Sequence, residues 1–267
     1  SASERLFGGL DALLGQLLTP KWPLPPVECA QGATSLIAHG RLQYALEQGA
    51  DVRAWPADAL PLHTLAAACA HLPTLRRLWA RDRPRVLCGL GNRALLVGGG
   101  LPDPSGQRVQ DLDWWQQTAV GALRVTSVPN QHGSRRGALD GDQTLWTAFV
   151  VESPHAGAFY FAGDTGYGAH FRAVAQRFPD LRLALLPIGA FRPRWFMHPQ
   201  HMSPLEAVQA HKDLGARTSV AMHFGTFDLA DDAMDEPVRV LRQRLSQEPA
   251  LEEQFHALGF GEGLDVP

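Results

Sequence analysis

Three polar side chains stand just past the ends of three short apolar segments, in positions where they could bind a metal ion. These side chains are His132, Asp164 and His223. The segments before them are residues 123–128, 158–162 and 218–222. Residues that follow strands lie on loops held by a rigid sheet, where sites are usually built. Imidazole nitrogen and carboxylate oxygen are ligands of zinc-like cations. The pattern favours a metal site over the alternative of three unrelated loop residues.

The elements that must position these residues are short strands that alternate with helices. Strands are expected at residues 123–128, 145–151, 158–162, 183–188 and 218–222, and helices at 73–81, 169–178 and 204–214. The last helix begins with a capping box, because Ser203 is followed by Pro204 and Glu206, and Gly215 follows its end. Alternating strands and helices indicate an α/β sheet covered by helices.

The chain shows no linker, so residues 1–267 are expected to form a single domain with an N-terminal helical arm at 1–26. Leucines at three- and four-residue steps predict a helix at 4–18, and a proline cluster ends it. This arm packs on the main body or, as the alternative, contacts a partner or a membrane surface.

Composition excludes several classes of protein. With 45% hydrophobic and 19% charged residues, the 267-residue chain is not disordered. Its net charge of −3 gives no basic field for nucleic acid, and no apolar run is long enough to span a bilayer. Three cysteines without a CxxC pair are typical of free thiols in a reducing compartment. We therefore expect a cytoplasmic protein, or one bound at a membrane periphery.

A collinear series of motifs resembles a known family. The motifs are Phe161-Ala-Gly-Asp164-Thr-Gly-Tyr167, Pro187-Ile-Gly-Ala190, Pro193-Arg-Trp-Phe-Met197, Gln200-His201-Met-Ser-Pro204 and Met222-His223-Phe-Gly-Thr226. They resemble metallo-β-lactamase-fold hydrolases, in the branch of N-acylphosphatidylethanolamine-hydrolysing phospholipase D and the ascorbate-6-phosphate lactonases. The resemblance implies a four-layer αββα sandwich of two mixed sheets, with a metal site at one edge.

The resemblance also implies roles for individual residues. His132 resembles a ligand of the first metal site, Asp164 the carboxylate that bridges two metals, and His223 a ligand of the second. His201 matches a histidine near the substrate pocket. Arg192 and Arg194 flank the pocket loop and could bind a phosphate or carboxylate; a surface ion pair is the alternative for both.

One departure from the family is large. Its most diagnostic motif, His-x-His-x-Asp-His, aligns with a segment in which Ala66, Ala68 and Ala70 replace two histidines and the aspartate, and only His71 remains. A catalytic zinc needs about three protein donors and an open position. The expectation is therefore one zinc ion at most, held by His71, Asp164 and His223 or by the weaker set of His132, Asp164 and His223.

Two functions remain open. The first is a metal-dependent hydrolase of a phosphodiester, lactone or related ester, mononuclear or impaired, in which Asp164 orients or deprotonates a water. Its substrate would be a small or lipid-like molecule. The second is a non-catalytic relative that keeps the fold as a ligand- or partner-binding module. Metal content separates the two.

Overall fold

The computed structural model of the chain describes residues 72–134, 141–225, 230–259 and 261–267. The predicted arm at 1–26 and the alanine-rich segment that ends at His71 lie outside the described residues. The single-domain boundary therefore stays a prediction. Within the described ranges, no helix is long and apolar enough to cross a membrane.

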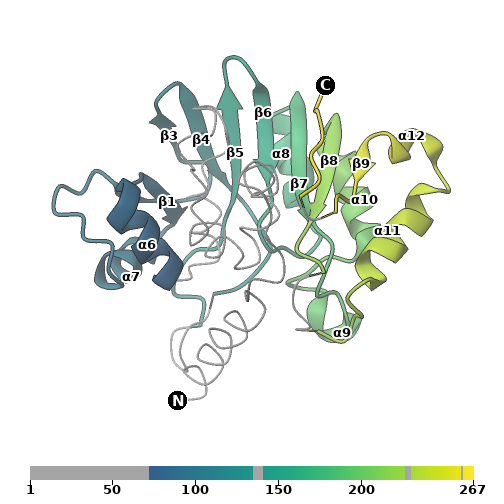
Figure 1. Cartoon of the computed structure of the whole chain (residues 1–267), viewed down its shortest axis with the longest axis horizontal. Helices are drawn as coiled ribbons and strands as arrows, with labels where there is room; N and C mark the ends of the chain where they lie inside the picture. The colour runs from purple at the N-terminus through teal and green to yellow at the C-terminus, as the bar shows by residue number, and fades with distance from the viewer. Residues whose placement is uncertain (1–71, 135–140, 226–229, 260) are drawn as a thin grey trace.

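A seven-stranded mixed sheet forms the centre of the described structure (Figure 1). In sheet order its strands are β3 (Gln117–Val120), β4 (Leu123–Val128), β5 (Ala148–Ser153), β6 (Gly157–Phe161), β7 (Leu181–Pro187), β8 (Thr218–Met222) and β9 (Phe255–His256). Strand β5 is antiparallel to both β4 and β6, and β6 to β9 are parallel. It follows that β4, β6, β7 and β8 all end at the same edge.

Both faces of this sheet are buried, because its strands alternate between two hydrophobic clusters. In β5, Ala148 and Val150 point into one cluster, whereas Phe149 and Val151 point into another. The first cluster contains residues of α8 (His170–Arg177), α10 (Pro204–Leu214), α11 (Glu236–Leu245) and α12 (Pro249–Glu252). These helices therefore form one outer layer.

The opposite face packs on a second, smaller sheet. In the described part this sheet has two parallel strands, β1 (Val86–Gly89) and β2 (Val109–Leu112). Leu87 and Leu112 pack with Val125 and Phe149 of the large sheet. Helices α6 (Leu72–Asp82) and α7 (Asn92–Gly98) pack against the small sheet and lie on the side away from α10 and α11 (Figure 1). The order of layers is αββα, as the family resemblance implied.

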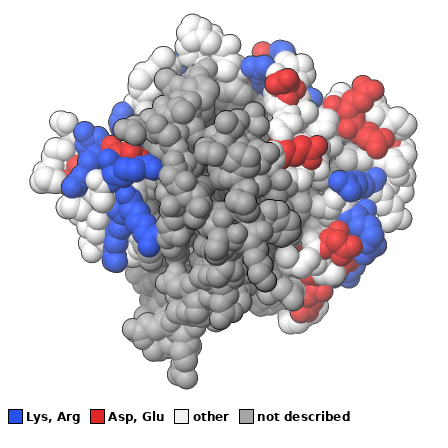
Figure 2. Space-filling model, viewed as in Figure 1, with Lys and Arg blue, Asp and Glu red and all other residues white. Residues whose placement is uncertain are grey.

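Charge is distributed unevenly over the visible face. Arginines gather on the α6 side, whereas acidic and basic residues mix around α11 and α12 (Figure 2). The exposed arginines of α6 include Arg76, Arg77 and Arg81, and Arg83 follows directly after it. Charged side chains thus lie on the exposed surface of the outer layers, whereas the buried faces are left to the apolar side chains of the core.

Several predicted elements have the observed bounds, and others shift or were missed. Residues 123–128, 204–214 and 218–222 are observed as expected. The strand expected at 145–151 runs instead from Ala148 to Ser153, because Leu145 to Thr147 approach the strand as a loop. Strands β1, β2, β3 and β9 are not predicted by the sequence pattern, because they have four residues or fewer and therefore carry little periodicity.

Helix α10 begins with the predicted capping box. Ser203 Oγ accepts from the Glu206 backbone N–H, the Glu206 carboxylate accepts from the Ser203 backbone N–H, and Gly215 ends the helix with φ 62°. On its inner face, His211 is only 3% exposed. Its Nδ1 lies 2.8 Å from Ser219 Oγ, and its Nε2 lies 3.4 Å from Gln254 Oε1.

His211 is expected to weaken the fold in acid. Burial lowers its pKa, as does the charge of Lys212, while the hydrogen bond with Gln254 opposes both. Below pH about 6.5 the His211 side chain binds a proton in the unfolded chain but resists it in the folded chain. The free energy of unfolding therefore decreases as the pH is lowered. Replacing His211 by glutamine should flatten the fall in thermal midpoint between pH 7 and 5. Replacing the exposed His155 in the same way should not; equal slopes in both variants would contradict this assignment.

Candidate metal centre

Three histidines and one aspartate gather at the edge where β4, β6, β7 and β8 end. His223 Nε2 lies 3.3 Å from Asp164 Oδ1. The His201 ring stacks on the His223 ring with centroids 5.5 Å apart, and its other neighbour is the His132 ring at 5.3 Å. The structure thus brings together His132, Asp164 and His223 from three loops, and it adds His201 between two of them.

Asp164 and His223 form an ion pair. Partial desolvation opposes ionisation of the Asp164 carboxyl, whose side chain is still 46% exposed, but the charge and hydrogen bond of His223 outweigh it and hold the pKa of Asp164 well below its usual range. Burial likewise opposes the charged form of His223, yet Asp164 raises the pKa of that ring to about 9. Burial lowers the pKa of His201 to about 4. At neutral pH the centre therefore holds a negatively charged Asp164 that is paired with a positively charged His223 ring.

The backbone under His223 is tightly constrained. His223 has φ 59°, a left-handed conformation that is uncommon outside glycine, and Ala190 has φ 56°. Gly189 lies directly against this turn, since a Cβ built on it would stand 2.0 Å from the His223 carbonyl oxygen. Ile188 also donates its N–H to the Met222 carbonyl. The two loops that follow β7 and β8 are therefore locked together at the site, where strain of this kind is often found.

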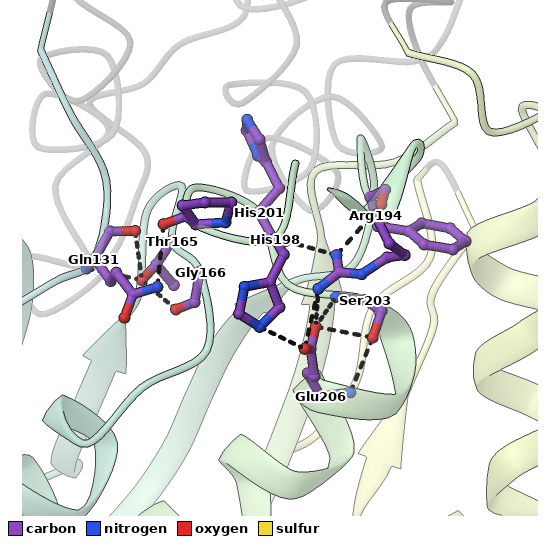
Figure 3. Close-up of polar contacts among 10 residues, drawn as sticks. Gln131, Thr165, Gly166, Arg194, His198, His201, Ser203 and Glu206 are labelled. Carbon is purple, nitrogen blue, oxygen red and sulfur yellow. Dashed lines mark hydrogen bonds and ion pairs between the residues drawn. The ribbon is translucent and has the colours of Figure 1, made fainter. Parts of the chain in front are cut away.

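A second set of hydrogen bonds joins the other site loops. Gly166 N donates to the Gln131 carbonyl at 2.7 Å, and Gln131 N donates to Thr165 Oγ1 at 3.1 Å. Met202 N donates to the Thr165 carbonyl, and Gln131 Nε2 donates to the Pro199 carbonyl (Figure 3). The fully buried Thr165 is thus the centre that fixes the neighbours of His132, Asp164 and His201.

The donors fit a metal ion in kind. His132 Nε2 and His201 Nδ1 are buried and have no hydrogen-bond partner among the described residues, so their lone pairs or N–H groups are unused. In spacing the fit is incomplete: within the described ranges, no group of three or more His, Cys, Asp or Glu side chains could hold a metal ion. His71, the fourth expected donor, lies outside those ranges.

The two arginines expected at the substrate are engaged with the protein. Arg192 Nε donates to Glu236 Oε1 at 2.8 Å, and its side chain is half-exposed, so it forms the surface ion pair that the sequence left as the alternative. Arg194 Nη2 donates to both oxygens of Glu206, at 3.0 and 2.8 Å. Its Nη1 donates to the His201 carbonyl at 2.9 Å.

Sequence reasoning did not identify two residues that build this site. In the sequence, Thr165 stands within the Asp164 motif and Glu206 within the capping box of a helix, and neither pattern indicates a role at the site. The capping box was a signal for Glu206, but it could not reveal that Arg194, twelve residues earlier, shares the same carboxylate. Both residues act on the site through the loops that they hold.

Comparison with known proteins identifies relatives of this chain. A family model described as a beta-lactamase superfamily domain matches residues 62–224. N-acyl-phosphatidylethanolamine-hydrolyzing phospholipase D 1 of Caenorhabditis elegans is 32% identical over 145 residues, which are 52% of this chain and 40% of that protein. A metal-dependent hydrolase of Rubrobacter xylanophilus is 28% identical over 263 residues, 96% of this chain and 89% of the relative.

The fold has counterparts among solved structures. Igni18, a metallo hydrolase of the hyperthermophilic archaeon Ignicoccus hospitalis, superposes with a TM-score of 0.51 at 19% identity, over 70% of each chain. At this level of identity the superposition shows a similar fold and nothing about function. The chain spans less than half the length of the first curated relatives that it matches, at 40% and 45%.

Proposed function

Since the chain belongs to the beta-lactamase superfamily, we propose that it is a metal-dependent hydrolase that cleaves a phosphodiester, a lactone or a related ester. The observation that carries the proposal is the meeting of His132, His201, His223 and Asp164 at the carboxyl edge of the large sheet. Relatives named as metal-dependent hydrolases support the same reaction class.

In this proposal one zinc-like cation would be held by His71, Asp164 and His223, or by the weaker set of His132, Asp164 and His223, and it would replace the proton of the His223 ring. A cation held there would polarise the scissile ester and acidify a water. Asp164, which is ionised at neutral pH, takes up the proton of the attacking water as the water oxygen bonds to the phosphorus or carbonyl carbon. The ester bond then breaks, and its oxygen leaves as an alcohol with the proton that Asp164 returns to it. His201 contacts the substrate from its place between the two other imidazoles.

A lipid-like substrate is supported by an exposed aromatic pair beside the site. Trp195 and Phe196 lie on α9 (Arg194–Met197), in the loop that follows β7, and are 84% and 65% exposed. Their ring centroids are 5.7 Å apart. Helix α9 protrudes at this end of the molecule (Figure 1). Exposed tryptophan and phenylalanine suit contact with acyl chains at an interface.

The proposal is tested by turnover with and without added zinc. We expect slow hydrolysis of a soluble aryl phosphodiester, because a single ion leaves the departing oxygen without a second stabilising charge. N-acylphosphatidylethanolamine in vesicles tests the lipid-like substrate in parallel. Zinc should raise both the rate and the thermal midpoint. Wild-type turnover of zero under every condition, with no stabilisation by zinc, would exclude the hydrolase.

A non-catalytic binding module is the second candidate. The incomplete spacing of donors among the described residues favours it, as do the alanines at 66, 68 and 70. In that case the polar groups at the edge would bind a ligand or be satisfied by water. Elemental analysis of protein purified without chelator separates the candidates, since the module would carry no stoichiometric metal. Location in the cytoplasm or at a membrane surface stays a prediction.

A further inference from the structure

We propose that Arg194 and Glu206 are positioning residues that act together as a clamp on His201, and that Arg194 does not bind substrate. The clamp joins the loop of residues 191–201 to the first turn of α10 (Figure 3). Its effect on catalysis rests on the proposed hydrolase function, whereas its effect on the loop does not.

Arg194 occupies its donors within the protein. Besides the two bonds from Nη2 to Glu206, Nη1 donates to the carbonyls of Phe191 and His201, at 3.3 and 2.9 Å. One guanidinium nitrogen thus holds backbone atoms ten residues apart. Because the side chains of Arg194 and Glu206 are only 33% and 24% exposed, this pair is less screened than an ordinary surface ion pair.

Glu206 is held in turn by the helix that it caps. Its Oε2 accepts from Ser203 N at 2.7 Å and from Ser203 Oγ at 2.9 Å. His198 Nε2 lies 3.6 Å from its Oε1. The carboxylate therefore has a fixed position set by α10, whose inner face is packed in the main core. Arg194 transmits that position to the loop.

The clamp fixes His201 through its backbone. The His201 N–H donates to the Met197 carbonyl at 2.8 Å, and its carbonyl accepts from Arg194. With both backbone groups held, the imidazole is directed between the rings of His132 and His223. Loss of either clamp residue would release the carbonyl and let the ring leave this position, which catalysis needs within about half an ångström.

Hydrogen exchange of residues 195–203 tests the clamp without any assay of activity. In Arg194→Met and Glu206→Gln, the amides of His201 and Met202 should exchange about tenfold faster than in the wild type. Lys212→Met is the matched control, because it removes an exposed ion pair with Glu248 from the same helix. Unchanged exchange in both clamp variants would overturn the proposal, whatever their activity. Arg194→Lys provides a folded alternative if Arg194→Met does not fold.

Kinetics then separate positioning from substrate binding. A clamp predicts that kcat/KM falls by a similar factor, about tenfold or more, in Arg194→Met and in Glu206→Gln, and that Arg194→Lys restores part of it. The double variant should lose no more than either single variant, since both break one unit. A KM that rises for Arg194→Met alone, with Glu206→Gln unaffected, would make Arg194 a substrate contact and overturn the clamp. A wild type that is inactive would end the hydrolase proposal and leave the exchange test standing.

Discussion

Replacing Asp164 by asparagine is expected to lower zinc-dependent turnover of an aryl phosphodiester by about 100-fold or more. The carboxylate has two roles in the proposed reaction, as a donor to the cation and as the acceptor of the water proton. An amide has neither the negative charge nor the basicity for these roles. His223 would also lose the negative charge that lies 3.3 Å from its Nε2. The measurement is steady-state turnover of both proteins over a series of zinc concentrations.

Thermal midpoints measured beside turnover show why activity is lost. Zinc should raise the midpoint of the wild type and leave that of Asp164→Asn nearly unchanged, because binding to the folded state alone is stabilising. Asp180→Asn is the control, since Asp180 is a surface residue paired with Arg217. An Asp164→Asn variant with wild-type turnover would remove Asp164 from the mechanism. Without zinc, its midpoint should fall below that of the wild type, because the His223 ring loses the negative charge that pairs with it.

Replacing Gly189 by alanine is expected to disrupt the centre and destabilise the fold by about 3 kcal/mol or more. The added Cβ would stand 2.0 Å from the His223 carbonyl oxygen and 3.1 Å from the carbonyl carbon. Backbone atoms cannot rotate away as a flexible side chain can, so the loops after β7 and β8 would have to separate. Because His223 already has a left-handed φ of 59°, this shift would displace its ring from Asp164. Urea unfolding and zinc binding measure the two effects.

Gly263→Ala is the control for this substitution, because nothing lies within 4 Å of the Cβ built there. It should unfold as the wild type does. If Gly189→Ala had the same stability as Gly263→Ala, the close approach of the two loops would be refuted. If it were destabilised but bound zinc normally, the approach would matter to the fold and not to the position of His223.

Local sequence patterns predicted the strands and the helix next to the site. They could not predict which side chains distant in the sequence form hydrogen bonds with one another. The apolar runs before Pro129 and His223 were long enough to define β4 and β8, and the cap at Ser203 defined the start of α10. Because these residues follow strands closely, finding the strands was enough to predict that His132, Asp164 and His223 lie near one another. The roles of the arginines could not be found in this way. The partner of Arg192 is Glu236, and that pairing arises only when α11 is placed beside the loop.

The short strands, such as β2, could not be predicted for a different reason. Strand β2 has the sequence Val-Gln-Asp-Leu, in which only the two ends are buried. Four residues of this kind do not alternate in a way that separates a strand from a loop. Its register beside β1 depends on contacts with residues over twenty positions away, such as Val86 with Val109.

The common direction of β4, β6, β7 and β8 divides the sheet into two ends with different tolerance for change. The turns at the other end, between β3 and β4 and between β5 and β6, carry none of the residues that meet at the candidate metal centre. Residues 154–156 form a hairpin turn of this kind, in which Pro154 and His155 are exposed. Surface turns accept inserted sequence far better than the elements they join. A fluorescent label or an affinity tag placed there should leave the candidate metal centre, at the opposite edge, undisturbed.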